Sequence, residues 1–572
     1  MRFKIIFFLL ALLYQSTSYS KALEASEFNQ KHLSSYFSAL LYYDNQKNAE
    51  ALKYFEDSKA LINNHDNFLR EYVFSLVLNG QVKKATKQIK LSKRSKKLDF
   101  FEANLLLVLD SLDKKNFKKA SLGLKKIEIF QDKTTYQFII FKILESYTNL
   151  FKSKKLEKPN KDFGNLSLIT EAFQNCYLNT SKTNSYFVNL INSAEGDYSR
   201  YLFFYLSKII KSKDLKTAKE ISNTIDPLRS SLLISQAKKW IEDKNTNQFS
   251  KYFSCNNEND LLAEFFFLIS NLYSSEDKFE QSNFYLNISN YLNPKFYFNL
   301  SLLAENFFLK KNFDVAIEIL KKFNKKDEVY YWYKIKKIVQ IYADEGNEKK
   351  SLDYLNKKVK ELKNPSNKIL YDIGNIYKSF KKYNQAIEYY SLVLSELDKN
   401  SATYADILYR RGGSFERLGK YELSDKDLLQ SLKIRPDDPY TLNYLAYGWL
   451  ERGYKIDESL KMLNKAYKQK KNDPYIIDSV GWGYYLVGDY EKAEKYLRKA
   501  VELLPDDPIA NDHYGDVLWH LNRKLQAKYF WESALNNEET DEEMKKDIKK
   551  KLLNGLKKFN SWNFTKLDHM QK

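Results

Sequence analysis

The densest cluster of chemically capable side chains lies in the segment NDHYGDVLWH, residues 511–520. On a helix, His513, Asp516 and His520 would occupy positions i, i+3 and i+7 on broadly one face, a geometry that a metal ion could use. The periodic pattern around them explains the same spacing without a metal. A metal-dependent enzyme is therefore the third and least favoured hypothesis, and we predict no cofactor.

Other catalytic signatures are missing from the sequence. It contains five histidines, no GxSxG or HExxH motif, and no glycine-rich loop of the kind that cradles phosphate. Paired carboxylates are frequent, but a chain with 29% charged residues produces such pairs on helical surfaces without any function. The sequence therefore predicts a protein that is not an enzyme.

The elements that would position the cluster are helix hairpins that recur about every 34 residues. Within 474–507, a first helix would present Ile477, Val480, Gly481 and Tyr484, and a second would present Tyr490, Ala493, Leu497 and Ala500, with Pro505 ending it. Gly481 and Ala493 mark the points where the two backbones approach most closely. Similar units occupy 367–400, 405–438, 439–473 and 508–541. One hairpin cannot bury its own apolar surface, so the copies must stack.

This spacing of large and small residues resembles the tetratricopeptide repeat (TPR), and the whole pattern resembles long exported TPR proteins of proteobacteria. The resemblance implies an all-α fold, an α-solenoid of antiparallel helix hairpins that forms a superhelix. It is clear over 263–541, where about eight units are expected, and weak over residues 37–124. It implies work as a scaffold or adaptor that binds other proteins, because the fold by itself assigns no activity.

The resemblance also implies which residues line the concave groove, because fixed positions of each first helix face it. They are Tyr371 and Asn375; Tyr440, Asn443 and Tyr447; Tyr475, Asp478, Trp482 and Tyr485; and Asp512, Asp516, Trp519 and His520. His513 would lie to the side. Aromatic anchors with carboxylates that select Lys, Arg or amide donors suit an extended or helical segment of another protein. The Lys, Asn and Arg set that clamps a chaperone's terminal carboxylate matches only at Asn375, so that partner is not expected.

Charge and composition leave a second function open. The net charge of +20 indicates mainly a lysine-coated exterior, and the 16% aromatic content is as well explained by codon bias as by binding. Lys-rich pieces such as residues 83–97 could bring weak contact with an anionic membrane surface or polymer, which is the alternative function. No nucleic-acid recognition motif accompanies them, so no specific nucleic acid is expected.

The first twenty residues read as a secretory signal, with Arg2 and Lys4 before an apolar run and a small-x-small exit at 18–20. An uncleaved signal that acts as an anchor is the alternative. We therefore expect an exported chain, in the periplasm if the source is Gram-negative, and associated with the envelope. Cys176 and Cys255 could form one disulfide there or stay as separate buried thiols.

The remaining organisation follows from the pattern. Residues 1–20 are the signal, 21–150 degenerate TPR-like hairpins, 151–168 a linker or loop, 169–262 helical repeats of uncertain register, 263–541 the array, and 542–572 a capping helix and tail. Thr540 is expected to cap that last helix through the amide of Glu543. The leading hypothesis is an exported TPR scaffold that binds proteins through its groove, serving assembly of an envelope complex.

Overall fold

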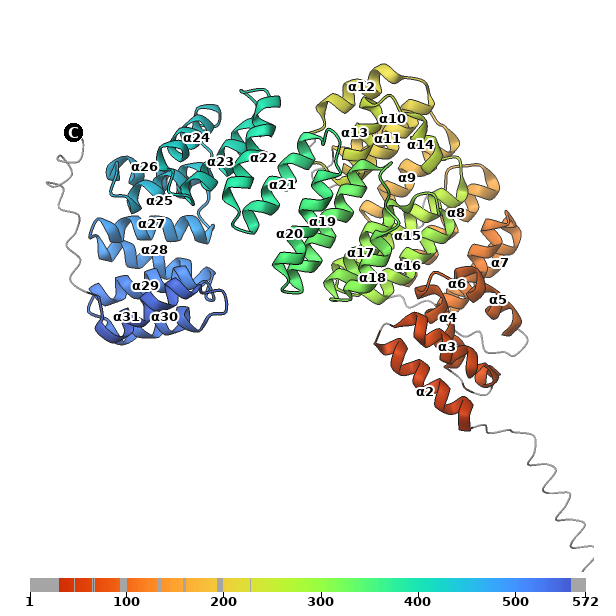
Figure 1. Cartoon of the computed structure of the whole chain (residues 1–572). Helices are drawn as coiled ribbons and strands as arrows, with labels where there is room; N and C mark the ends of the chain where they lie inside the picture. The colour runs from red at the N-terminus through yellow and green to blue at the C-terminus, as the bar shows by residue number, and fades with distance from the viewer. Residues whose placement is uncertain are drawn as a thin grey trace, which may run out of the picture. The chain divides into compact units, whose positions relative to one another are not determined.

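The computed structural model describes residues 30–556, except 46, 64, 66, 93–99, 131–135, 158–160, 193–198 and 227. The described chain is helical, and its helices pack as antiparallel hairpins, which confirms the expected fold class (Figure 1). The predicted signal segment lies outside the described residues. None of the described helices is both long and apolar enough to cross a bilayer.

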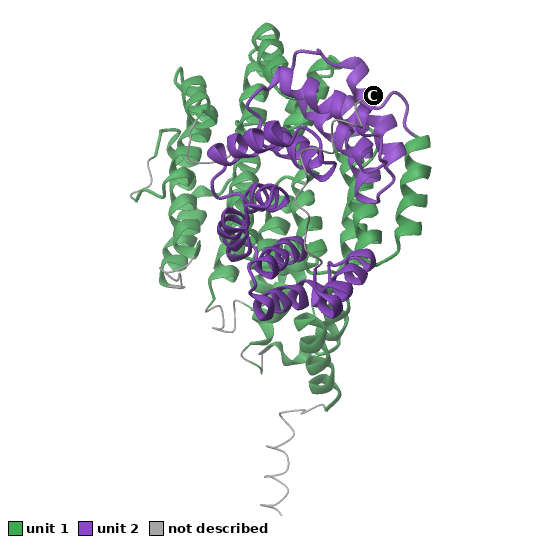
Figure 2. Cartoon of the chain, turned by 90° about the vertical axis from the view of Figure 1, so that its left-hand side faces the viewer, with its two compact units in different colours: residues 1–361 green, residues 362–572 purple. Residues whose placement is uncertain are grey.

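The chain divides into two compact units, residues 1–361 and 362–572 (Figure 2). This division falls inside the predicted 263–541 array. The helices of the first unit are α2 (Gln30–Asp44), α3 (Asn48–Asp57), η1 (Lys59–Asn63), α4 (Phe68–Leu78), α5 (Val82–Ser92), α6 (Phe101–Asp113), α7 (Phe117–Phe130), α8 (Tyr136–Ser153), α9 (Asn165–Leu178), α10 (Thr183–Ile191), α11 (Ser199–Lys211), α12 (Leu215–Thr224), α13 (Leu232–Glu242), α14 (Asn247–Tyr252), α15 (Glu258–Ser275), α16 (Phe279–Leu292), η3 (Tyr297–Asn299), α17 (Leu300–Leu309), α18 (Phe313–Leu320), α19 (Glu328–Asp344) and α20 (Glu348–Lys360).

The first unit is more than a chain of neighbouring hairpins, because α16 packs against α4 as well as against α15 and α17. The rings of Phe74 and Phe284 lie 4.7 Å apart, and Asn287 Nδ2 donates to the carbonyl of Leu78 at 3.1 Å. One continuous apolar core runs through this unit. The predicted loop at 151–168 overlaps the end of α8 and the start of α9, and the described residues between them, 154–157 and 161–164, lie outside any helix.

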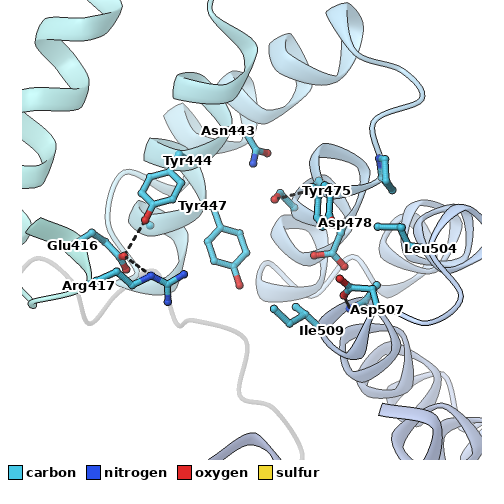
Figure 3. A pocket seen from close by; sticks show the side chains of 14 residues that line it. Glu416, Arg417, Asn443, Tyr444, Tyr447, Tyr475, Asp478, Leu504, Asp507 and Ile509 are labelled. Carbon is cyan, nitrogen blue, oxygen red and sulfur yellow. Dashed lines mark hydrogen bonds and ion pairs between the residues drawn. The ribbon is translucent and has the colours of Figure 1, made fainter. Parts of the chain in front are cut away.

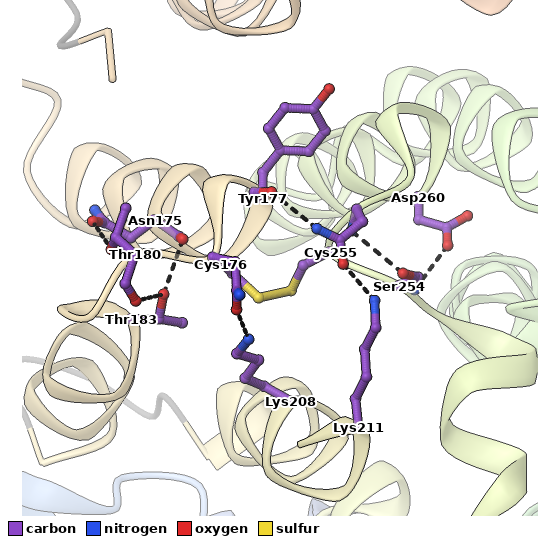
Figure 4. The surroundings of a disulfide bond; sticks show 12 residues. Asn175, Cys176, Tyr177, Thr180, Thr183, Lys208, Lys211, Ser254, Cys255 and Asp260 are labelled. Carbon is purple, nitrogen blue, oxygen red and sulfur yellow. Dashed lines mark hydrogen bonds between the residues drawn. A yellow bond between two sulfur atoms is a disulfide. The ribbon is translucent and has the colours of Figure 1, made fainter. Parts of the chain in front are cut away.

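A disulfide joins Cys176, near the end of α9, to Cys255, just before α15, with 5.7 Å between the Cα atoms (Figure 4). The bridge therefore brackets α10 to α14. Asn256 Nδ2 donates to the carbonyl of Tyr177 at 2.9 Å, which holds the two segments together beside the bridge. Of the two possibilities that the sequence left open, the structure shows the disulfide.

The described part of the second unit consists of five hairpins and a closing helix. Its helices are α21 (Asn367–Ser379), α22 (Tyr383–Glu396), α23 (Ala402–Glu416), α24 (Tyr421–Ile434), α25 (Pro439–Glu451), α26 (Ile456–Gln469), α27 (Pro474–Leu486), α28 (Tyr490–Leu503), α29 (Pro508–His520), α30 (Lys524–Asn536) and α31 (Glu542–Asn554). Asp438, Asp473 and Asp507 cap α25, α27 and α29, each followed by a proline at the first helical position. The regular DP pairs thus set where each of these first helices begins.

Close packing within the hairpins follows the predicted small residues. A Cβ atom on Gly481 would lie 2.6 Å from Leu497 Cγ, and one on Gly515 would lie 2.5 Å from Trp531 Cδ1. Gly374 and Gly412 face Tyr390 and Leu428 in the same way, at 2.8 and 3.0 Å. In every case the large residue follows the glycine by sixteen positions. The glycine on the first helix therefore makes room for the large side chain of the second.

The closing helix α31 starts one residue later than expected. Asp541, rather than Thr540, is its N-cap, and its carboxylate accepts from the amides of Glu543 and Met544. Thr540 is buried and donates instead to the carbonyl of Ala534. Ile548 is buried against the last hairpin, with Met544, Leu552 and Leu556 beside it, as predicted.

Candidate functional site

A cavity of about 400 Å³ opens on the first helices of the second unit (Figure 3). Its walls come from the end of α23 and from α25, α27 and α29. Predicted groove residues in its lining are Asn443, Tyr447, Tyr475 and Asp478. The structure therefore brings together the middle of the predicted groove, from two consecutive repeats.

Sequence reasoning missed other parts of this lining, namely Glu416, Arg417 and Tyr444. Tyr444 donates to Glu416 Oε2 at 3.1 Å, and Arg417 Nε lies 3.7 Å from the same oxygen. Glu416 and Arg417 stand at the end of α23, in a repeat for which no groove positions were assigned. Applying the same groove positions to the last turn of α23 would have identified both residues.

The hydroxyl of Tyr447 points into the cavity, between Glu416 and Arg417 on one side and Asp478 on the other (Figure 3). Burial raises the pKa of Tyr447 above its ordinary value, and the carboxylates of Glu451 and Asp478 raise it further against the opposing Arg417. The surroundings of this hydroxyl are thus net negative. They would favour a cation over an anion.

Asp478 is held in place by His513. The Nδ1 atom of His513 lies 3.0 Å from Asp478 Oδ2, and its ring stacks on Trp482 with 3.9 Å between centroids. Burial opposes a charged imidazole, but the Asp478 carboxylate raises the pKa of His513 above its ordinary value. His513 is therefore a buried residue outside the cavity lining, and it fixes the position of a cavity carboxylate.

The far end of the predicted groove is covered by α31, which corrects the expected exposure there. Lys551 Nζ lies 2.7 Å from Asp512 Oδ2 and 2.9 Å from Asp516 Oδ2. Trp519 Nε1 donates to the carbonyl of Leu556 at 3.1 Å. Asp512, Asp516 and Trp519 therefore serve the docking of the last helix, because that helix lies where a ligand would.

Other predicted residues are also more enclosed than expected. Tyr485 is only 3% exposed and stacks on Trp482 at 4.6 Å. His520 stacks on Tyr490 at 4.9 Å, with Nδ1 3.0 Å from the carbonyl of Asp516. His513 and His520 thus have separate neighbours, and among the described residues no group of three metal-ligating side chains is arranged to hold an ion.

The amino-terminal end of the predicted groove lies apart from the cavity lining. Asn375 Oδ1 accepts from the hydroxyl of Tyr390 at 2.8 Å, so it supports the hairpin of α21 and α22. The guanidinium of Arg410 lies 5.3 Å from the ring centroid of Tyr371. In contrast, Tyr440 and Tyr475 are 47% and 63% exposed and remain available to a partner.

A second cavity, of about 500 Å³, lies in the first unit around Arg200. Arg200 makes a two-point ion pair with Glu264 at 2.7 and 2.8 Å and donates to Asn299 at 2.7 Å. Its guanidinium also lies 3.8 Å from the ring centroid of Phe267. The charged group of this cavity is therefore committed to the packing of α11 against α15, which leaves the cavity of the second unit as the better binding site.

Comparison with known proteins finds repeats in three hairpins of the second unit. The tetratricopeptide repeat family matches residues 368–396, 405–438 and 476–507. These hairpins thus match TPR repeats, and TPR domains generally mediate protein–protein interactions. No curated protein matches it.

Several solved bacterial structures are similar to part of the chain. A TPR protein of Thermus thermophilus is 18% identical, over 33% of this chain and 100% of that one, with a TM-score of 0.29. The pilF protein of Pseudomonas aeruginosa is 15% identical, over 33% and 91%, with a TM-score of 0.28. A TPR protein from Parabacteroides merdae is 18% identical, over 45% and 99%, with a TM-score of 0.38.

Proposed function

We propose that this chain is an exported scaffold that binds a segment of another protein in the cavity of its second unit, in the assembly of an envelope complex. The observation that supports it best is the cavity itself, lined by Tyr447, Tyr475 and Asp478 from successive repeats. Tyr475 and Ile509 of this lining are exposed, and so is Tyr440 of the preceding repeat, which gives one exposed apolar residue on each of three first helices. Such aromatic anchors beside a few polar groups suit a peptide segment.

The proposed compartment is supported by the disulfide between Cys176 and Cys255, because disulfides persist mainly in oxidising surroundings. The predicted signal at residues 1–20 points the same way. Export and a role in envelope assembly are thus parts of the same proposal as the binding of a partner in the groove.

Site-specific photocrosslinking in the native cell tests the binding function. A benzoylphenylalanine replaces Tyr475 in the cavity or, as the matched control, Tyr529 of α30, which is 67% exposed and outside the lining. We expect a defined protein to crosslink from position 475 only. That protein, once purified, should bind the wild-type chain, and Tyr475→Ser should weaken binding several-fold. The same set of products from both positions would count against a specific groove.

The packing of each candidate residue decides which one is best for such a test. Trp519 is a poor choice, because α31 covers it and its loss would disturb the last hairpin. Trp482 stacks on His513 and Tyr485, so its removal would also change packing. Tyr475 is the better site, because its exposed ring can change without loss of a core contact.

A further inference from the structure

A lysine of the closing helix α31 is bound by two carboxylates of α29. Lys551 is 11% exposed, and its ammonium group lies within 2.9 Å of both Asp512 and Asp516. These two carboxylates are four residues apart on α29, so they project from the same face. A buried ammonium group is stable only when carboxylates of this kind compensate its lost hydration. The site on α29 is thus a lysine site that the chain fills itself.

The preceding repeat presents a carboxylate at the equivalent place. Asp478 of α27 precedes Asp512 by 34 residues, which is one repeat. Here the described ion-pair partner is the imidazole of His513, which is buried and does not belong to the cavity lining. In front of Asp478, where α31 fills the next repeat, the cavity is open.

The cavity walls suit the same ligand chemistry. Tyr444, Tyr447 and Tyr475 line it, and aromatic faces attract ammonium and guanidinium groups. Its charged groups are Glu416, Asp478 and Asp507 against the single cation Arg417. Arg417 pairs with Glu416, and Asp507 accepts from the amide of Ala510 as a helix cap. Asp478 is therefore the carboxylate with an open side.

We propose, resting on the groove-binding function above, that the partner segment inserts a lysine or arginine side chain into this cavity, with its charged group beside Asp478 and its stem against Tyr447 and Tyr475. Lys551 is then the internal counterpart of the partner's residue, one repeat further on. The occupant is a cationic segment of a protein, selected by charge as well as by shape.

Defined peptide pools test this specificity on the full-length chain. Three fluorescent pools share neutral randomised flanks and differ at one central residue, which is lysine, norleucine or glutamate. By fluorescence polarisation, the wild-type chain should bind the lysine pool about tenfold more tightly than the norleucine pool, and the glutamate pool most weakly. Higher salt should reduce the advantage of lysine.

Variants assign the selectivity to the cavity. Asp478→Asn should abolish the preference for lysine while it keeps an acceptor for His513. Asp457→Asn, an exposed change on α26, should leave the preference intact. Should Asp478→Asn fail to fold, Tyr475→Ser serves instead, because its ring is 63% exposed, and it should weaken the lysine pool several-fold.

The outcomes separate this inference from the function on which it rests. Equal binding of the lysine and norleucine pools, or preference for glutamate, would overturn the inference and leave groove binding in place. Lysine preference that survives Asp478→Asn in a folded protein would overturn it as well. A wild-type chain that binds none of the pools would overturn both.

Discussion

Gly481 lies directly opposite Leu497, so closely that a Cβ atom on the glycine would be 2.6 Å from Leu497 Cγ. Real Cβ atoms do not come this close to a carbon, so α27 and α28 could keep their separation only with glycine at this position. The same relation recurs in the hairpins of Gly374, Gly412 and Gly515. The packing distance of these hairpins is thus set by one small residue in each.

Gly481→Ala should therefore destabilise the second unit by about 1–3 kcal/mol, because the added methyl group forces Leu497 or the helices to move. Gly448→Ala is the matched control, since a Cβ there meets nothing within 4 Å. That change should be neutral or stabilise α25 by up to about 1 kcal/mol through helix propensity. Urea unfolding followed by circular dichroism measures both. Equal effects would show that backbone approach does not limit this hairpin.

Lys551→Met should loosen the closing helix, because it leaves the carboxylates of Asp512 and Asp516 buried without their cation. We expect a loss of about 3 kcal/mol. Lys545→Met, which breaks the more exposed pair with Glu542 on the same helix, should cost less than about 1 kcal/mol. Hydrogen exchange of α31 amides locates the change. Addition of Asp512→Asn and Asp516→Asn should recover much of the loss. If Lys551→Met left the hydrogen-exchange protection of the α31 amides unchanged, these ion pairs would not be what holds the closing helix in place.

The stability of the first unit should fall as pH rises from about 4 to above 6. Burial raises the pKa of Asp260 from its ordinary value of 3.8 to about 6. The folded chain therefore holds this proton more tightly than the unfolded chain. This stabilisation is fully present below about pH 4 and is lost as pH rises through about 6.

Asp260→Asn should remove this contribution, because asparagine can still accept from the amide of Ser254 but carries no charge. Above pH 6 the variant should be more stable than wild type by about 1–3 kcal/mol. Asp314→Asn, an exposed change on α18, should keep the wild-type pH dependence. Thermal unfolding at several pH values gives the comparison. If the stability of Asp260→Asn and that of wild type changed with pH in parallel, Asp260 would not be the source of the pH dependence.

Cys176→Ser with Cys255→Ser should destabilise the first unit by about 2–5 kcal/mol, because the bridge closes a loop across a sequence separation of 79. In cells that express the native chain, both thiols should resist alkylation until a reductant is added. Mass spectrometry of the unreduced protein should find Cys176 linked to Cys255 within one chain, which would show the oxidised state directly. Rapid alkylation of both residues without a reductant would argue against the proposed compartment.

The hairpins were predictable because their signals are local. Gly481, Leu497 and the DP pairs at 438–439, 473–474 and 507–508 fix helix starts and close contacts within one repeat. The packing of α16 on α4 was not, because it joins residues such as Leu78 and Asn287 that no repeat relates. The disulfide was not predictable for the same reason, because the fold of the segment between two cysteines decides whether they come close enough to pair.

The site was predictable in its middle and not at its end. Repeat phase places Tyr447, Tyr475 and Asp478 on one face, and the structure gathers them in the cavity. Phase treats every repeat alike, however, so it could not show that α31 lies over Asp512 and Asp516. It also could not place His513 against Asp478, because that contact joins two repeats through a buried ring.

The bridge between Cys176 and Cys255 also affects how the chain responds to mechanical load. When a molecule is pulled from its two ends, tension passes directly through the disulfide, and the bracketed segment from α10 to α14 bears none of it. With a sequence separation of 79 and about 3.3 Å per extended residue, the oxidised chain should stretch about 260 Å less than the reduced one. For a protein that spans between anchored partners, the redox state of one bond would thus set its maximum reach.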